Sequence, residues 1–284
     1  MGIHIRAMTP TDIPAGMRLK DLAGWNQTAE DWARFLETDP QGCFVAECQG
    51  QVVGTATTII YEGRLAWVGM VLVDPDFRGK GIGTAVLESA VAYLDGQRVP
   101  CIKLDATPQG KPLYERLGFR AEYEIERCLL RRTGGRIGGD ASQAPCQGEN
   151  LTAALAIDRD VFGANRSAVL RSIARAAPEL VALAQDDSGL QGYALGRKGS
   201  HADHLGPWVA RNARAAQDLL DRFLERTLRD VIVVDILTDN PWARALAANK
   251  GFEFSRTLTR MYRGTNEHPG LPEIVCAILG PELG

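Results

Sequence analysis

Long hydrophobic runs are missing from this sequence: no apolar stretch approaches the roughly 20 residues that a membrane-spanning helix needs. Met1 to Thr11 also lacks the basic and apolar regions of a signal peptide, so we expect a cytoplasmic protein with no membrane partner. Positive charge is not in excess either, because the net charge is −3, and this argues against nucleic acid as a partner. With 45% hydrophobic and 24% charged residues, the 284-residue chain has the composition of a soluble globular protein of one or two domains.

Cysteine and histidine are few and scattered. The six cysteines include no Cys-x-x-Cys pair, and most of them lie in apolar, strand-like segments. Buried free thiols in a reducing compartment are therefore expected, rather than disulfides or zinc ligands. Among the four histidines, His201 and His204 are only three residues apart, but no wider ligand pattern surrounds them, so no metal site is expected.

What the chain does contain is a glycine-rich turn between a strand and a helix. Trp67 to Val73 is an almost unbroken apolar run rich in β-branched residues, which predicts a strand covered on both faces. Pro75 ends this strand, and the apolar spacing of residues 85–94 predicts a helix with one buried face. The intervening glycines at every second position allow successive N–H groups to converge on one anion at the helix N-terminus. The turn therefore predicts a phosphate site.

Two common phosphate motifs do not fit this turn. A P-loop requires Ser or Thr after the lysine, but Lys80 is followed by Gly81. A dinucleotide fingerprint counted from Gly79 would place its third glycine at Thr84. The turn, Arg78-Gly79-Lys80-Gly81-Ile82-Gly83, resembles instead the Arg/Gln-x-x-Gly-x-Gly pyrophosphate loop of the GNAT family of acetyl-CoA-dependent N-acetyltransferases.

A second stretch, about thirty residues further on, is similar to the other signature of this family. Pro112 to Phe119 reads as a short helix that ends in Leu-Gly-Phe, with Gly118 suited to the left-handed position after a helix. Tyr114 stands where many members of the family carry a tyrosine beside the coenzyme sulfur. The resemblance implies an α/β (α+β) fold of tandem GNAT type, in which each mixed, mostly antiparallel central sheet is flanked by helices. It also implies acetyl-CoA as cosubstrate.

The resemblance further implies which residues hold the coenzyme. In GNAT folds the strand corresponding to Val68–Val73 splays from its parallel neighbour, so its backbone can bind the pantetheine and the thioester carbonyl. Tyr114 would protonate the departing thiolate; the alternative is a half-buried helix tyrosine with no chemical role. The implied coenzyme-binding residues are Val71, Leu72, Val73, Arg78, Gly79, Lys80, Gly81, Ile82, Gly83 and Thr84.

A base is needed to make the acceptor amine neutral. Glu62, Asp74 and Asp105 are the candidates, and Asp105 is the best placed because it ends a parallel strand, where α/β sites gather. Asp105 could equally cap the turn at Thr107-Pro108.

The acceptor site is expected on the loop between the first two helices. Thr28 and Asp31 form a capping-box pattern that starts the second of them. Trp25, Asn26 and Gln27 come just before it and would stack on and hydrogen-bond a small polar acceptor. Trp25 could equally plug a gap between the helices.

The second half of the chain repeats the pattern of the first. Residues 134–148 are rich in glycine and small polar residues and read as a linker between a catalytic domain over 1–133 and a GNAT-like domain over 149–284. The whole chain resembles bacterial two-domain proteins with a YitH-type C-terminal half, through Phe162–Ser167, Leu205–Pro207 and Gly280–Gly284. In the C-terminal half, the loop from Val209 to Ala215 has no glycine, and Ala247 stands in place of Tyr114. We therefore expect this half to have lost catalysis.

Two functions follow from these observations. The first is an acetyl-CoA-dependent N-acetyltransferase that passes an acetyl group directly to a primary amine on a small molecule or a peptide. The second is a non-catalytic acyl-CoA-binding sensor that kept the phosphate loop alone. The presence of Tyr114 favours the enzyme.

Overall fold

The computed structural model describes residues 2–132 and 148–284, so most of the expected linker and Cys146 lie outside the described residues. The chain divides into two compact units that are not two consecutive stretches of sequence. The first unit consists of residues 1–121, Met261–Glu267 and Pro281–Leu283. The second unit consists of Glu122–Arg260, His268–Gly280 and Gly284. Short C-terminal segments thus belong to the first unit.

The first unit is built on one mixed, mostly antiparallel sheet in the order β1-β2-β3-β4-β5 followed by the end of β11. Only β4 and β5 are shown to run parallel, as the chain crosses between them through a helix. The elements are β1 (Ile3–Ala7), α1 (Ile13–Leu22), α2 (Ala29–Thr38), β2 (Phe44–Cys48), β3 (Gln51–Tyr61), β4 (Leu65–Val73), α3 (Ile82–Gly96), β5 (Cys101–Ala106), α4 (Lys111–Arg116) and the last residues of β11 (Glu253–Gly264).

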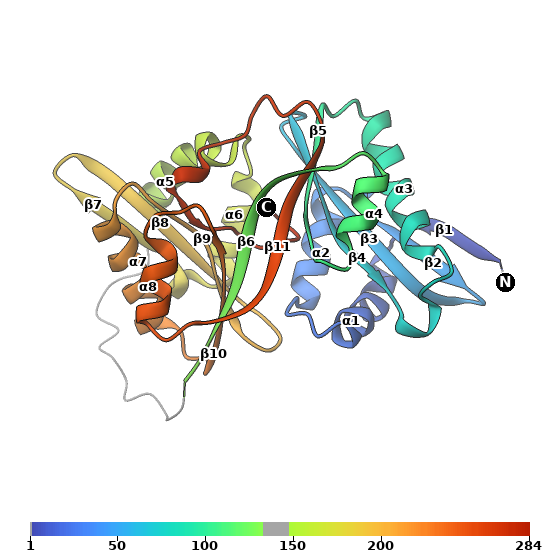
Figure 1. The fold of residues 1–284 in the computed structure, drawn as a ribbon, viewed down its shortest axis with the longest axis horizontal. Coiled ribbons are helices and arrows are strands. Elements are labelled where there is room, and N and C mark those ends of the chain that lie inside the picture. The colour runs from blue at the N-terminus through green and yellow to red at the C-terminus, as the bar shows by residue number, and fades with distance from the viewer. Residues whose placement is uncertain (1, 133–147) are drawn as a thin grey trace. The chain divides into compact units, whose positions relative to one another are not determined.

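Helices cover both faces of this sheet (Figure 1). Ala66 and Val68 of β4 pack in one apolar cluster with residues of α3 and α4. Because successive strand residues point to opposite faces, Trp67 and Gly69 face the other way, the side on which α1 and α2 lie. The sequence prediction of the α2 start is confirmed, since Thr28 Oγ1 accepts from the Asp31 N–H in a complete capping box.

The second unit repeats this architecture. Its sheet has the order β11-β6-β10-β12-β9-β8-β7. Each unit is thus a sheet flanked by helices, as the expected tandem fold requires. The elements are β6 (Arg120–Arg131), α5 (Gly148–Phe162), α6 (Ser167–Ala176), β7 (Ala182–Asp186), β8 (Gly189–Lys198), β9 (Asp203–Ala210), α7 (Ala213–Arg226), β10 (Val231–Leu237), α8 (Ala243–Asn249), β11 and β12 (Val275–Ala277).

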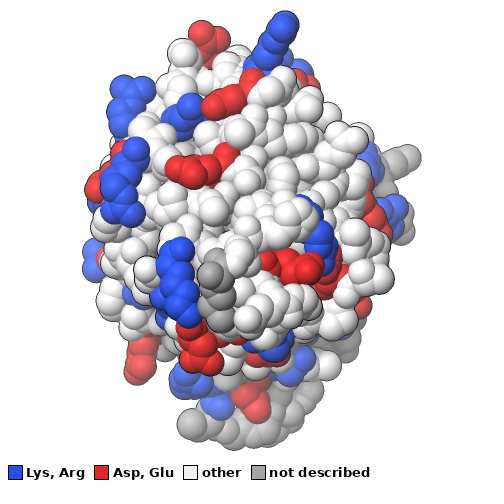
Figure 2. Space-filling model, turned by 90° about the vertical axis from the view of Figure 1, so that its right-hand side faces the viewer, with Lys and Arg blue, Asp and Glu red and all other residues white. Residues whose placement is uncertain are grey.

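The described cysteines are buried free thiols, as predicted: Cys43, Cys48, Cys101, Cys128 and Cys276. In residues 2–132 and 148–284, no group of three or more His, Cys, Asp or Glu side chains is arranged to hold a metal ion. No described helix is both long and apolar enough to cross a membrane. Figure 2 shows Lys and Arg side chains interspersed with Asp and Glu over the drawn face, so charge of one sign does not gather there.

Candidate active site

Strands β4 and β5 separate along their length. Their parallel ladder joins Leu65–Trp67 to Cys101–Lys103 and stops there, although β4 continues to Val73 and β5 to Ala106. The predicted splay is therefore confirmed. The backbone of Val71, Leu72 and Val73 lies beyond the last β4–β5 pair, on the part of β4 that has no ladder on its β5 side.

A β-bulge in β4 lies at the start of this split. Thr55 pairs with Leu72 and Thr57 with Gly69, so Met70 and Val71 together oppose a single residue of β3. Met70 has φ of 50°, a left-handed conformation that is rare for a non-glycine residue. Thr55 Oγ1 donates to the Met70 carbonyl oxygen at 2.7 Å and fixes this backbone. Bulges of this kind re-aim backbone groups and occur often beside active sites.

The glycine-rich turn has the geometry of an anion site. Gly79 and Gly81 have φ of 75° and 79°, and a Cβ built on either meets no atom within 4 Å. Gly81 caps α3 without a side chain, and the first helical hydrogen bond runs from the Ala85 N–H to its carbonyl. The N–H groups of the first turn, at residues 82–84, have no intrahelical acceptor. Open space in front of unbonded donors and the positive end of a helix dipole fits a pyrophosphate.

The two cations of the turn are exposed and held beside it. Arg78 Nε donates to the Val73 carbonyl at 3.2 Å. Lys80 Nζ donates to the Asp76 carbonyl at 3.1 Å and lies 4.8 Å from the centroid of the Phe77 ring. Both charges stay near the α3 N-terminus, where they add to its attraction for a phosphate. Gly83 differs from expectation in lying inside α3, where a Cβ would make ordinary contact with the Val73 side chain at 3.4 Å.

Tyr114 lies in α4 at the edge of the apolar cluster that joins α3, α4 and the sheet. Its ring packs edge-on against Phe119 at 6.1 Å between centroids, and its side chain is almost fully buried. Burial raises the pKa of its hydroxyl to about 12, so the phenol is protonated at neutral pH. The difference between the pKa of this hydroxyl and that of a thiol, about 8.5, is therefore larger than for an exposed tyrosine. Tyr114 must then donate its proton while negative charge develops on the sulfur.

The other expected site residues lie in two places. Trp25 and Asn26 are half-buried and Gln27 is buried on the loop between α1 and α2. Asp105 is half-buried near the end of β5. Asp74, another candidate base, binds Arg18, and this hydrogen bond lowers the pKa of its carboxyl, so it is a poor proton acceptor.

The second unit has the same split between parallel strands, but its own chain fills it. β12 pairs with β9 through Val275 and Ala277 and with β10 through Ala277. The Ile278 N–H extends this strand by donating to the Asp235 carbonyl at 3.0 Å. The sequence did not reveal β12, because three apolar residues carry no periodicity. A split closed by hydrogen bonds on both sides has no room for a pantetheine arm.

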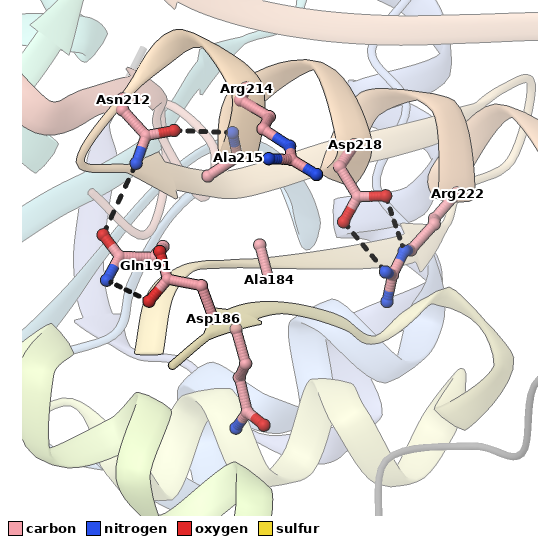
Figure 3. A pocket seen from close by; sticks show the side chains of 9 residues that line it. Ala184, Asp186, Gln191, Asn212, Arg214, Ala215, Asp218 and Arg222 are labelled. Atoms are coloured by element: carbon pink, nitrogen blue, oxygen red, sulfur yellow. Dashed lines mark hydrogen bonds and ion pairs between the residues drawn. The ribbon is translucent and has the colours of Figure 1, made fainter. Parts of the chain in front are cut away.

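The start of α7 is closed as well. Asn212 caps this helix, and its Oδ1 accepts from the Ala215 N–H at 2.9 Å, so a side chain takes the place that an anion would occupy. A cavity of about 260 Å³ lies beside it (Figure 3). Several of its polar side chains bond one another: Asn212 bonds Gln191, Gln191 bonds Asp186, and Arg222 bonds Asp218. In place of Tyr114 stands Ala247, which is buried and offers no hydroxyl.

Comparisons with known proteins find a family match in each half of the chain. Residues 15–119 match the model of the acetyltransferase (GNAT) family, and residues 154–273 match that of an acetyltransferase (GNAT) domain. The chain belongs to the GNAT acetyltransferase family, whose members use acetyl-CoA. It is therefore an N-acetyltransferase with two GNAT domains.

Three similar proteins illustrate the relationship. The uncharacterized N-acetyltransferase YitH of Bacillus subtilis is 24% identical over 207 residues, which cover 72% of each chain. The holothin acyltransferase of a Pseudoalteromonas species is 26% identical over 267 residues, covering 92% of this GNAT chain and 87% of that protein. A crystal structure from Pyrococcus horikoshii, assigned to the acetyltransferases, has a TM-score of 0.80 at 25% identity and covers 100% of this chain and 96% of its own.

We expect one molecule of acetyl-CoA to bind per chain of this GNAT protein. The first unit has an open split and an uncapped glycine turn, whereas the second has a split filled by β12 and a helix capped by Asn212. Isothermal titration calorimetry of the full chain with acetyl-CoA measures the stoichiometry. Two molecules of acetyl-CoA bound per chain with similar affinity would contradict the conclusion that β12 closes the second site.

Proposed function

We propose that the first unit transfers the acetyl group of acetyl-CoA directly to the primary amine of a small molecule. The observation that carries this proposal is the combination in one unit of the β4–β5 split, the bulge at Met70 and the uncapped turn at Gly81. Together they offer backbone donors at the two places where the cosubstrate carries or develops negative charge, the pyrophosphate and the thioester oxygen. In the second unit β12 fills the split and Asn212 caps the helix, so this unit takes no part in coenzyme binding.

The residues have separate roles in this proposal. N–H groups at the start of α3, from Ile82 to Thr84, bind the pyrophosphate, and Arg78 and Lys80 add positive charge beside it. Backbone groups of Val71 to Val73 bind the pantetheine and polarise the thioester carbonyl. Tyr114 donates its hydroxyl proton toward the thiolate as the C–S bond breaks. Asp105 stays a prediction for the base.

A small-molecule acceptor is favoured by two features. The holothin acyltransferase, by its name, modifies a compound rather than a protein, and it aligns with nearly the whole of this chain. The α1–α2 loop also offers an indole and two amides, at Trp25, Asn26 and Gln27, which suit stacking on and hydrogen bonding to a compact polar molecule.

The proposal is tested by release of CoA thiol from acetyl-CoA in the presence of defined amines: propylamine, glucosamine, spermidine and the α-amine of free amino acids. Thiol should appear faster than in buffer with at least one of them, and mass spectrometry should find the acetylated amine. Tight binding of acetyl-CoA without transfer to any acceptor would favour the sensor instead.

A further inference from the structure

The C-terminal tail, Pro281–Leu283, lies on the face of β4 that is opposite α3. Two hydrogen bonds fix its backbone on either side of Glu282. Trp67 Nε1 donates to the Pro281 carbonyl at 2.9 Å, and the Tyr61 hydroxyl donates to the Leu283 carbonyl at 2.9 Å. Both donors are large side chains of the central strands, almost fully buried. The residue between these two anchors is Glu282, the one ionisable side chain of the tail.

Gly69 makes this contact possible. A Cβ at position 69 would lie 2.7 Å from the Glu282 carbonyl oxygen and 3.0 Å from its Cβ, closer than packed atoms allow. Because Gly69 has no side chain, the tail can pack against β4 here. The backbone of Glu282 occupies the space that a Cβ at position 69 would fill. Gly69 directly precedes the bulge residue Met70. The tail thus brings the Cα and Cβ of Glu282, a residue only 3% exposed, against the strand residue that precedes the bulge.

Other polar groups share this face. Thr57 is the register partner of Gly69, and residues directly opposite in an antiparallel pair point to the same side. Its hydroxyl is fully buried and, within the described residues, has no hydrogen-bond partner. Lys103 pairs with Trp67, so Asp105, two residues later on β5, also belongs to this face. A buried hydroxyl left without a bond is costly unless a polar group reaches it, and it points to a ligand here.

We propose that Glu282 is the base that accepts the proton from the acceptor's ammonium group; this rests on the proposed function. A simple alkylamine has a pKa near that of lysine, about 10.4, so at neutral pH nearly all of it carries a proton that blocks attack. Glu282 lies on the face of β4 on which α1 and α2 lie, and we expect the acceptor at the loop between these two helices, so its ammonium would arrive on this face. The Thr57 hydroxyl lies on the same face and accepts a hydrogen bond from the bound amine.

The proton balance is complete without further reagents. The Glu282 carboxylate takes one proton from the ammonium, and the freed nitrogen lone pair forms the C–N bond to the acetyl carbon. The C–S bond then breaks, with its electron pair going to sulfur. The second nitrogen proton leaves as the amide forms and replaces the one that Tyr114 gives to the thiolate. Glu282 releases its proton to solvent, so the products are the amide, CoA thiol and one proton.

The test compares two acceptors. Propylamine is an ammonium ion at neutral pH and needs the base, whereas hydroxylamine is already unprotonated. Glu282→Gln should lower kcat for propylamine by about 10²-fold, the lower end of the range for one general base, and should lower that for hydroxylamine far less. Glu282→Asp, which keeps the carboxylate, should recover part of the activity with propylamine. Glu88→Gln, at an exposed position of α3, is the matched control and should change neither rate.

The outcomes separate the two proposals. Calorimetry should give the wild-type acetyl-CoA affinity for Glu282→Gln, and its melting curve should show a folded protein, because the substitution keeps the shape of the side chain. Equal loss with both acceptors, or no loss with either, would overturn the role of Glu282 and leave the proposed function in place. A selective loss in Asp105→Asn but not in Glu282→Gln would move the base to β5. Failure of the wild-type protein to release thiol with any amine would overturn the proposed function itself.

Discussion

Replacing Gly81 with Asp should weaken acetyl-CoA binding by about 10³-fold. At φ of 79° the new side chain would enter the open space before the first turn of α3. Its carboxylate would accept hydrogen bonds from the same N–H groups that bind the pyrophosphate, as Asp does at many helix N-caps. Like charges about 4 Å apart repel by about 4 kcal/mol near a protein surface, and each 1.4 kcal/mol is a factor of ten in affinity.

The fold should survive this change, because Asp tolerates the left-handed conformation and is a favourable N-cap. Gly50→Asp is the matched control: its φ is 77°, a Cβ there also meets nothing within 4 Å, and it lies in the β2–β3 hairpin. Calorimetry with acetyl-CoA should show loss of binding for Gly81→Asp alone. An affinity equal to that of the wild type would remove this turn from the coenzyme site.

Tyr114→Phe should lower kcat by about 10²- to 10⁴-fold, the range for one general acid. The phenyl ring keeps the contact with Phe119 and the packing of the cluster, so acetyl-CoA affinity and folding should change little. Tyr93→Phe is the control, since it removes the hydroxyl of another tyrosine of the first unit, one that donates to Asp39. A Tyr114→Phe enzyme with full turnover would assign protonation of the thiolate to water.

The same residue predicts a dependence on pH. The folded pKa of Tyr114 is raised from 10 to about 12 by burial, so the buried neutral hydroxyl contributes stability that is complete below pH 10 and is lost as the pH rises through 12. Melting temperatures measured between pH 9 and 11.5 should therefore fall more steeply for the wild type than for Tyr114→Phe. Identical slopes would show that Tyr114 is not buried in its neutral form.

Much of this architecture was predictable because its signals are local. The glycines of the Arg78–Gly83 turn indicate backbone conformations that other residues avoid. The apolar residues of α7 recur at a spacing that places them on one face of the helix. The apolar run Val231–Leu237 coincides with β10. The same locality allowed the two halves to be compared, and the lack of glycine from Val209 to Ala215 agrees with the ordinary helix start found for α7.

The C-terminal segment could not be predicted, because its structure depends on contacts that are distant in the sequence. β12 and the tail are short, and what fixes them is contact with strands many residues away. Gly69 in β4 and Gly206 in β9 are the one sequence feature that marks this segment, because the backbone of Glu282 crosses the first and that of Ile278 crosses the second. A glycine in a strand signals a close approach, but sequence alone does not say what approaches.

The central claim is that coenzyme binding and acetyl transfer belong to the first unit, at the split between β4 and β5. A crystal structure of the full chain grown with acetyl-CoA tests this most directly. We expect one coenzyme per chain, its pyrophosphate on the N–H groups that open α3, its thioester at the Met70 bulge and its sulfur within hydrogen-bonding distance of the Tyr114 hydroxyl. A coenzyme bound between β9 and β10 with β12 displaced, or a pyrophosphate away from the Gly79–Gly81 turn, would contradict the account.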